Sequence, residues 1–198
     1  MQNKIKAWSS LFLSAVFFIT VFMEYIPTPQ DIIELTFLAN FGTGILLLLT
    51  GIRLLKGGKF FPTIVYQIGL VTIILVFIIC LAGLTGIYKI HFEGEFFFLH
   101  VVNPLLFFFY NVIFIECPKN KKSVLLTPVP AILYLYLDLI IGSLSGKYIY
   151  DITPREEWNI VKSIGVSAIS YFFILFIAYI LYFSTLYLKT SCKRKSDN

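Results

Sequence analysis

The sequence predicts an all-α protein, a polytopic membrane bundle of six transmembrane helices with both termini in the cytoplasm. Composition is the first observation, because 58% of the 198 residues are hydrophobic and only 14% are charged, whereas soluble domains carry roughly 25% charged residues. The second observation is the spacing of the charges along the chain, and the third is their unequal distribution between alternate connections. So large an apolar excess cannot be buried in one water-soluble core, and a lipid bilayer is its natural solvent.

The charged residues fall in clusters, and the gaps between the clusters have the length of a membrane span. A helix needs about 20 mostly apolar residues to cross roughly 30 Å of hydrocarbon. We predict six spans, at residues 8–23, 32–55, 62–87, 96–115, 125–144 and 161–188. The connections are short, so the chain divides into a six-helix transmembrane domain over residues 1–188 and a basic cytoplasmic tail over 189–198.

Lysine and arginine are distributed very unequally between the two sides of such a bundle. One side receives Lys4, Lys6, Arg53, Lys56, Lys59, Lys119, Lys121, Lys122, Lys189, Lys193, Arg194 and Lys195, and the other receives Lys89, Lys147, Arg155 and Lys162. Cytoplasmic connections carry the excess of positive charge, so both termini are predicted to be cytoplasmic. This retention signal also explains the formal net charge of +5, and nucleic acid is not an expected partner.

Cysteine usage and overall composition bound the remaining classes of function. Cys80, Cys117 and Cys192 form neither a CxxC motif nor a spaced framework, so no disulfide, metal site or cofactor is expected. The Lys-, Ile- and Phe-rich usage and the short connections are typical of a small bacterial protein. We therefore expect an integral protein of a bacterial plasma membrane, with an oligomeric state that the sequence leaves open.

Polar side chains inside the spans are the candidates for function, because hydrocarbon penalises them unless they are paired or face water. Thr36 and Asn40 are four residues apart and share one face of the second span. A packing face with asparagine as an interhelical hydrogen-bond donor is the simpler interpretation of that pair. His100 and Asn103 begin the fourth span, where a hydrogen-bonded structural histidine is the simpler alternative to a catalytic one.

Asp138 is the only acidic residue deep in a predicted span. A carboxylate at that depth must be paired, neutral or in contact with water. It could fix helix packing through a hydrogen bond, orient a histidine, or carry a proton. These three roles remain open from the sequence.

Distance along the chain places Thr36 and His100 at one depth in the membrane. Thr36 lies five residues inward from Asp31, and His100 lies five residues inward from Glu95. Both are therefore roughly 7–8 Å below their flanking charges, and the second and fourth helices could bring them together near the outer surface. Asp138 lies deeper, which suits a supporting role.

Three short patterns lie in or beside the second, fourth and fifth spans. They are Leu35-Thr36-Phe37 with Asn40, Leu99-His100 with Pro104, and Gly142 followed by Gly146-Lys147-Tyr148-Ile149-Tyr150. Together they resemble the androgen-induced-gene family, which includes the androgen-dependent regulator of tissue factor pathway inhibitor and bacterial relatives. The resemblance covers most of the chain in topology, although the prolines of the bacterial Tyr-Pro-Tyr-Pro loop are absent here.

The resemblance implies an intramembrane hydrolase of a lipid ester, since mammalian members cleave fatty acid esters of hydroxy fatty acids with one threonine and one histidine. By residue matching, Thr36 stands at the nucleophile position and His100 at the position of the base. The substrate would be a membrane lipid or a lipid-like ester, bound near the outer leaflet. Asn40, Asn103 and Asp138 are the expected supporting residues, with the two amides as candidate donors to an oxyanion.

The residue types agree with this chemistry but also allow other functions. A threonine hydroxyl becomes a useful nucleophile when a base removes its proton, and histidine can remove and return a proton near neutral pH. Phenylalanine and leucine at 96–98 and 105–109 could line an acyl pocket or simply face lipid. The alternatives are a small-solute or proton transporter centred on Asp138, and a non-catalytic lipid-binding or scaffolding protein.

Overall fold

The structure, a computed structural model, describes residues 2–83, 94–116, 121–146, 149 and 160–196. These residues contain no β-strand. Six helices are long and apolar enough to cross a membrane: Asn3–Tyr25, Leu35–Leu55, Thr63–Leu81, Gly94–Phe114, Lys121–Ser145 and Ile164–Thr190. The predicted all-α fold with six spans is therefore confirmed.

The spans are built from seven α-helices and three short helical segments. The α-helices are α1 (Gln2–Tyr25), α2 (Leu35–Leu55), α3 (Thr63–Gly83), α4 (Gly94–Phe97), α5 (Asn103–Phe114), α6 (Val129–Ser145) and α7 (Ile160–Ser196). A π-helical segment, Phe98–Val102, joins α4 to α5, so the fourth span is composite. The 3₁₀ segments are Pro29–Ile33 before α2 and Lys121–Leu126 before α6.

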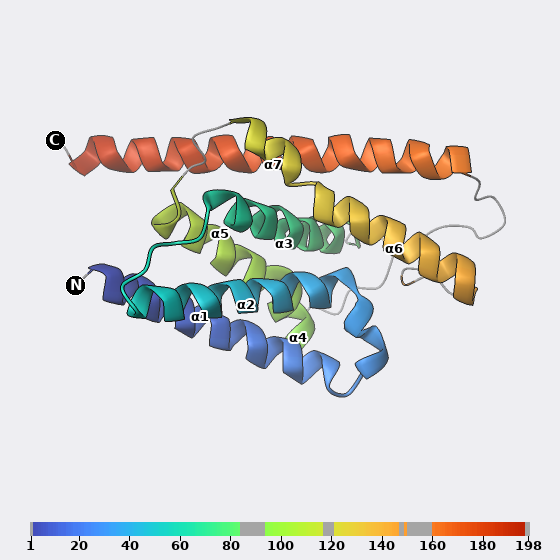
Figure 1. The fold of residues 1–198 in the computed structure, drawn as a ribbon, viewed down its shortest axis with the longest axis horizontal. Coiled ribbons are helices and arrows are strands. Elements are labelled where there is room, and N and C mark those ends of the chain that lie inside the picture. Colours follow the sequence, from blue (N-terminus) through green and yellow to red (C-terminus); the bar gives the residue numbers. More distant parts are fainter. Residues whose placement is uncertain (1, 84–93, 117–120, 147–148, 150–159, 197–198) are drawn as a thin grey trace.

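The helices α1 and α2 form a closely packed antiparallel pair along one side of the molecule (Figure 1). Close approach requires glycine at Gly51, because a Cβ atom there would lie 2.6 Å from Leu11 Cγ. The Ser14 hydroxyl adds a hydrogen bond of 2.9 Å to the Gly44 carbonyl. Small residues of α2 therefore pack directly against α1 at Gly44 and Gly51.

The other helices complete the bundle around this pair. Figure 1 shows α3 and α5 in its middle and α7 along the side opposite α1, with α6 beside α7. The beginning of α1 and the end of α7 lie at the same end of the bundle, as an even number of spans requires. The helix α7 continues to Ser196, into the segment expected to form a tail.

The second span begins at Leu35, three residues later than the sequence predicted. Pro29–Ile33 forms a 3₁₀ segment, and Glu34 then takes an extended conformation with φ −64° and ψ 147° as the N-cap of α2. The Tyr25 hydroxyl donates to Glu34 Oε2 at 3.0 Å, which ties this N-cap to the end of α1. The late start places Thr36 in the first turn of α2.

Candidate functional site

The side chains of Thr36, on α2, and His100, on the π-helical segment, face one another. The distance from Thr36 Oγ1 to His100 Nε2 is 3.3 Å, with Thr36 buried in the first turn of α2 and His100 half-buried in the π-helical segment. These residues are 64 positions apart in the chain. The structure thus brings together the two side chains that the depth argument placed at one level.

The position of Thr36 in its helix explains why its hydroxyl is available to the histidine. Thr50 and Thr72, which lie further along their helices, bond to the carbonyls four residues earlier, those of Leu46 and Ile68. Thr36 has no such helical carbonyl, because the residue four positions earlier belongs to the 3₁₀ segment. Its side chain can therefore turn toward His100.

The tautomer of the neutral His100 ring follows from its second hydrogen bond. Nδ1 lies 2.9 Å from the Phe96 carbonyl oxygen, and a carbonyl only accepts, so Nδ1 carries the proton. Nε2 then presents a lone pair to the Thr36 hydroxyl, which donates. The Phe96 ring stacks on the imidazole with centroids 3.9 Å apart, so it holds the ring in this orientation.

The π-helical segment around His100 has an identifiable cause and a tertiary consequence. The Asn103 N–H bonds to the Phe98 carbonyl five residues earlier, and Pro104 has no N–H to offer. The Leu99 carbonyl therefore loses its usual helical donor, and Asn40 Nδ2 donates to it instead at 3.2 Å. Such π segments occur frequently at functional sites.

Asn40 and Asn103 form a buried network behind the pair. Asn40 Nδ2 also donates to the Thr36 carbonyl at 2.9 Å. Asn103 Nδ2 donates to Asn40 Oδ1 and to Thr20 Oγ1, both at 2.9 Å. Each amide has two N–H groups, and all four are occupied here, so the network holds backbone in position and leaves no spare donor for an oxyanion.

Asp138 lies apart from this network in the described part of the chain. Its Oδ1 accepts a hydrogen bond of 2.5 Å from the backbone N–H of Ile149. Nearby, Gly146 ends α6 in the left-handed conformation, with φ 70°. The carboxylate therefore fastens the chain after α6 back onto the helix, and the described hydrogen bonds do not connect it to His100.

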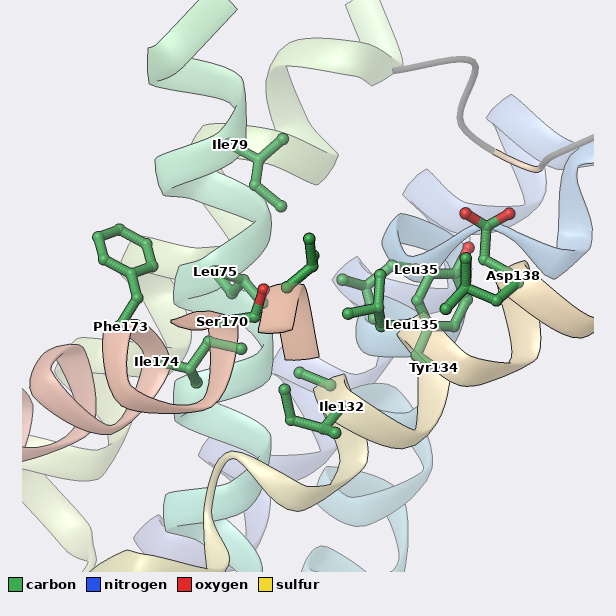
Figure 2. A pocket seen from close by; sticks show the side chains of 13 residues that line it. Leu35, Leu75, Ile79, Ile132, Tyr134, Leu135, Asp138, Ser170, Phe173 and Ile174 are labelled. Carbon is green, nitrogen blue, oxygen red and sulfur yellow. The ribbon is translucent and has the colours of Figure 1, made fainter. Parts of the chain in front are cut away.

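A cavity of about 320 Å³ lies between α3, α6 and α7 and reaches the beginning of α2. Figure 2 shows Leu35, Tyr134, Leu135 and Asp138 on one side of it and Leu75, Ile79, Phe173 and Ile174 on the other. A second cavity, of about 330 Å³, shares Leu35 and Tyr134 with the first and lies between α2 and α3. Residues 96–98 and 105–109, for which the sequence allows either an acyl pocket or a lipid-facing surface, line neither of these cavities.

Glu34 supplies the titratable group nearest to Thr36 in sequence. Burial raises the pKa of its carboxyl above the ordinary value. The hydrogen bond from Tyr25 opposes this increase, and the negative charges of Asp31 and Glu24 add to it. The N-cap of α2 therefore favours a neutral glutamic acid more strongly than an exposed site does.

Sequence reasoning missed the Phe96 carbonyl, the contribution of Thr20 and the cavity. One signal was available, because Pro104 four residues after His100 removes a helical hydrogen bond. Other expectations lie outside the described residues: Lys147, Tyr148 and Tyr150 of the loop pattern, the connections at 84–93 and 150–159, and Cys117. The side chains of Cys192 and the basic residues near it lie there too.

Comparison of the chain with protein-family models, with curated proteins and with solved structures finds no match. The arrangement of residues described above is therefore the basis for a functional conclusion.

Proposed function

We propose that this protein is an intramembrane hydrolase of lipid esters, with Thr36 as nucleophile and His100 as general base. The single observation that carries the proposal is the 3.3 Å approach of Thr36 Oγ1 to His100 Nε2, in a ring whose other nitrogen is committed to the Phe96 carbonyl. A nucleophile beside a base that a third group orients is the arrangement of covalent hydrolases. The resemblance to the androgen-induced-gene family points to the same two residues.

The proposed reaction has two steps. Nε2 takes the hydroxyl proton while Thr36 Oγ1 attacks the ester carbonyl carbon, and the same proton passes to the departing alcohol oxygen as the carbon–oxygen bond breaks. Water then attacks the acyl-threonine and gives one proton to Nε2. That proton returns to Thr36 Oγ1 when the fatty acid leaves, so the enzyme is restored.

The first turn of α2 can supply the groups that stabilise the oxyanion. The first N–H groups of a helix have no intrahelical acceptor, and the first such bond in α2 runs from Leu38 N to Glu34 O. In the described residues no side chain caps this terminus. The N–H groups of Thr36 and Phe37 thus lie beside the nucleophile, as backbone donors do in other hydrolases.

The location of the pair suits an ester whose tails remain in the bilayer. Thr36 lies at the end of α2 that is remote from the beginning of α1 (Figure 1). With both termini cytoplasmic, as the lysine and arginine distribution predicts, that end is at the outer face of a bacterial plasma membrane. Water can reach it there, while the acyl chains stay in hydrocarbon.

The contacts of Asp138 favour hydrolysis over the alternative of transport. Its carboxylate has a structural partner in the Ile149 amide, so its presence in the bundle does not require a transported proton. A purely scaffolding function would use the Thr36–His100 hydrogen bond only to hold α2 against the π-helical segment, and labelling of Thr36 by a reactive probe distinguishes the two roles.

A fluorophosphonate probe tests the assignment on the full-length protein purified in detergent. Covalent labelling is expected in the wild type, and Thr36→Ala should abolish it. Thr36→Ser should retain labelling, because serine preserves the hydroxyl. His100→Gln should lower the labelling rate by about 10²–10⁴-fold, the usual contribution of general base catalysis. Labelling that survives Thr36→Ala would exclude Thr36 as the nucleophile.

A further inference from the structure

The cavity between α3, α6 and α7 has a buried floor and an exposed rim. Leu35, Leu75, Ala131 and Ile174 are buried and form the floor. Phe173, with a relative exposure of 52%, belongs to the rim, together with Ile79 and Val166. The cavity therefore extends from the surface of the bundle to the residue that precedes Thr36.

The rim lies inside the part of the protein that the bilayer surrounds. Ile79 belongs to the apolar span Thr63–Leu81, and Phe173 belongs to the span Ile164–Thr190. Ile79 and Val166 lie two residues from the ends of their spans, whereas Phe173 lies nine residues inside, so the solvent at the Phe173 end of the mouth is lipid hydrocarbon rather than water. A molecule that enters here must come sideways from the membrane.

The lining is matched to hydrocarbon in chemistry and in size. Most of its side chains are aliphatic or aromatic, and polar groups come from Tyr134, Asp138 and Ser170. The Asp138 carboxylate points away from the cavity, toward the segment that holds Ile149 (Figure 2). A volume of about 320 Å³ lies in the range of sites that bind small organic ligands, roughly 300–1,000 Å³.

We propose that this cavity binds one hydrocarbon chain of a membrane lipid, which enters between α3 and α7 and ends with its ester group beside Leu35. The binding of a hydrocarbon chain follows from the apolar lining of the cavity and from the opening of its mouth toward the bilayer. The direction of the chain rests on the proposed function, because Leu35 is joined directly to the proposed nucleophile.

Photoaffinity labelling tests the cavity without requiring hydrolysis. The full-length protein in detergent is irradiated with a long-chain fatty acid that carries a diazirine on its chain, and the labelled residues are located by mass spectrometry. Labels that unlabelled fatty acid displaces are expected within residues 131–139 and 166–174. Displaceable labels confined to other segments would overturn the proposal.

A matched pair of variants on α7 separates the cavity from the lipid-facing surface. Ser170 lines the cavity, whereas Ala168 is exposed on the same helix. Ser170→Leu should lower displaceable labelling about tenfold, because added methylene groups occupy the space of the chain, and Ala168→Leu should leave it unchanged. Ala131→Leu narrows the same cavity from α6 and replaces Ser170→Leu if that variant does not fold. Equal labelling in the cavity variants and in Ala168→Leu would overturn the proposal.

The Thr36→Ala variant distinguishes failure of this inference from failure of the proposed function. It should lose hydrolysis and keep displaceable labelling at the cavity. Cavity labelling without any hydrolysis by the wild type would support chain binding and remove the hydrolase proposal. Hydrolysis that depends on Thr36 but is unaffected by both cavity variants would support the hydrolase and overturn the cavity as its chain site.

Discussion

The side chain of Asn40 donates a hydrogen bond to the carbonyl of Leu99, the residue before His100, at 3.2 Å. The same amide nitrogen donates to the carbonyl of Thr36. One buried side chain therefore holds the backbone of both members of the proposed catalytic pair. This bridge therefore helps to set the distance between hydroxyl and imidazole.

Removal of the bridge should affect turnover more than substrate binding. Asn40→Ala leaves the buried Leu99 carbonyl without its donor and Asn103 Nδ2 without one of its acceptors, which costs about 1–3 kcal/mol of stability. The pair then loses its alignment, so kcat for ester hydrolysis should fall by about tenfold or more while KM changes little. Kinetics on the purified variant, together with its thermal unfolding, give both quantities.

Asn111 offers the matched control for that experiment. It is also fully buried, and its Nδ2 donates to the Phe107 carbonyl within its own helix. No hydrogen bond in the described part of the chain links it to Thr36 or His100. Asn111→Ala should lower the unfolding temperature comparably and leave kcat near that of the wild type. Equal losses of kcat in the two variants would assign the effect of Asn40 to stability alone.

Pro104 is expected to sustain the π-helical segment at the expense of helix stability. Proline inside a helix removes a hydrogen bond and costs about 3 kcal/mol, less within the first turn. Pro104→Ala restores an N–H four residues after His100 and permits regular α-helix there. We expect hydrolysis to fall by about tenfold, as misalignment of a catalytic group commonly causes, with no decrease in the unfolding temperature. An active variant with a regular helix would show that the π segment is dispensable.

The sequence predicts the topology well because its signal is carried by many residues. Six apolar stretches separated by charges fix the spans, whereas the ends of the spans differ from the predicted bounds by several residues. At α2 the 3₁₀ segment that begins at Pro29 delays the helix until Leu35. Composition and spacing reveal neither this turn nor the hydrogen bond between Tyr25 and Glu34 that accompanies it.

The candidate site is only partly predictable from the sequence, because it too depends on contacts between residues that are far apart in the chain. Equal depth indicates that Thr36 and His100 can meet, but depth does not give the rotation of a helix about its axis. The tautomer of His100 depends on a backbone carbonyl. The roles of Asn40 and Asn103 depend on which of their side-chain N–H groups already have acceptors in the folded protein. Asp138 was an ambiguous polar residue until its contact with Ile149 was known.

The contact between Asp138 and Ile149 makes a separate prediction for two variants. In Asp138→Asn the side-chain oxygen can still accept the Ile149 N–H, so hydrolysis should persist and stability should change by less than about 1 kcal/mol. Asp138→Leu removes the acceptor and should destabilise the protein by about 1–3 kcal/mol. Unfolding scans and hydrolysis assays measure both effects. Loss of function in a well-folded Asp138→Asn would instead favour a role in proton transfer.

The raised pKa of Glu34 predicts how stability depends on pH. Since the folded state favours the neutral carboxyl, it binds more protons than the unfolded state between the ordinary pKa and the raised one. The stabilisation is therefore complete below the ordinary pKa of 4.5 and is lost as the pH rises through the raised value. Glu34→Gln keeps an oxygen that can accept from the Tyr25 hydroxyl but cannot ionise, so this loss should disappear. Unfolding temperatures of both proteins across this pH range measure the difference, and parallel curves would contradict the prediction.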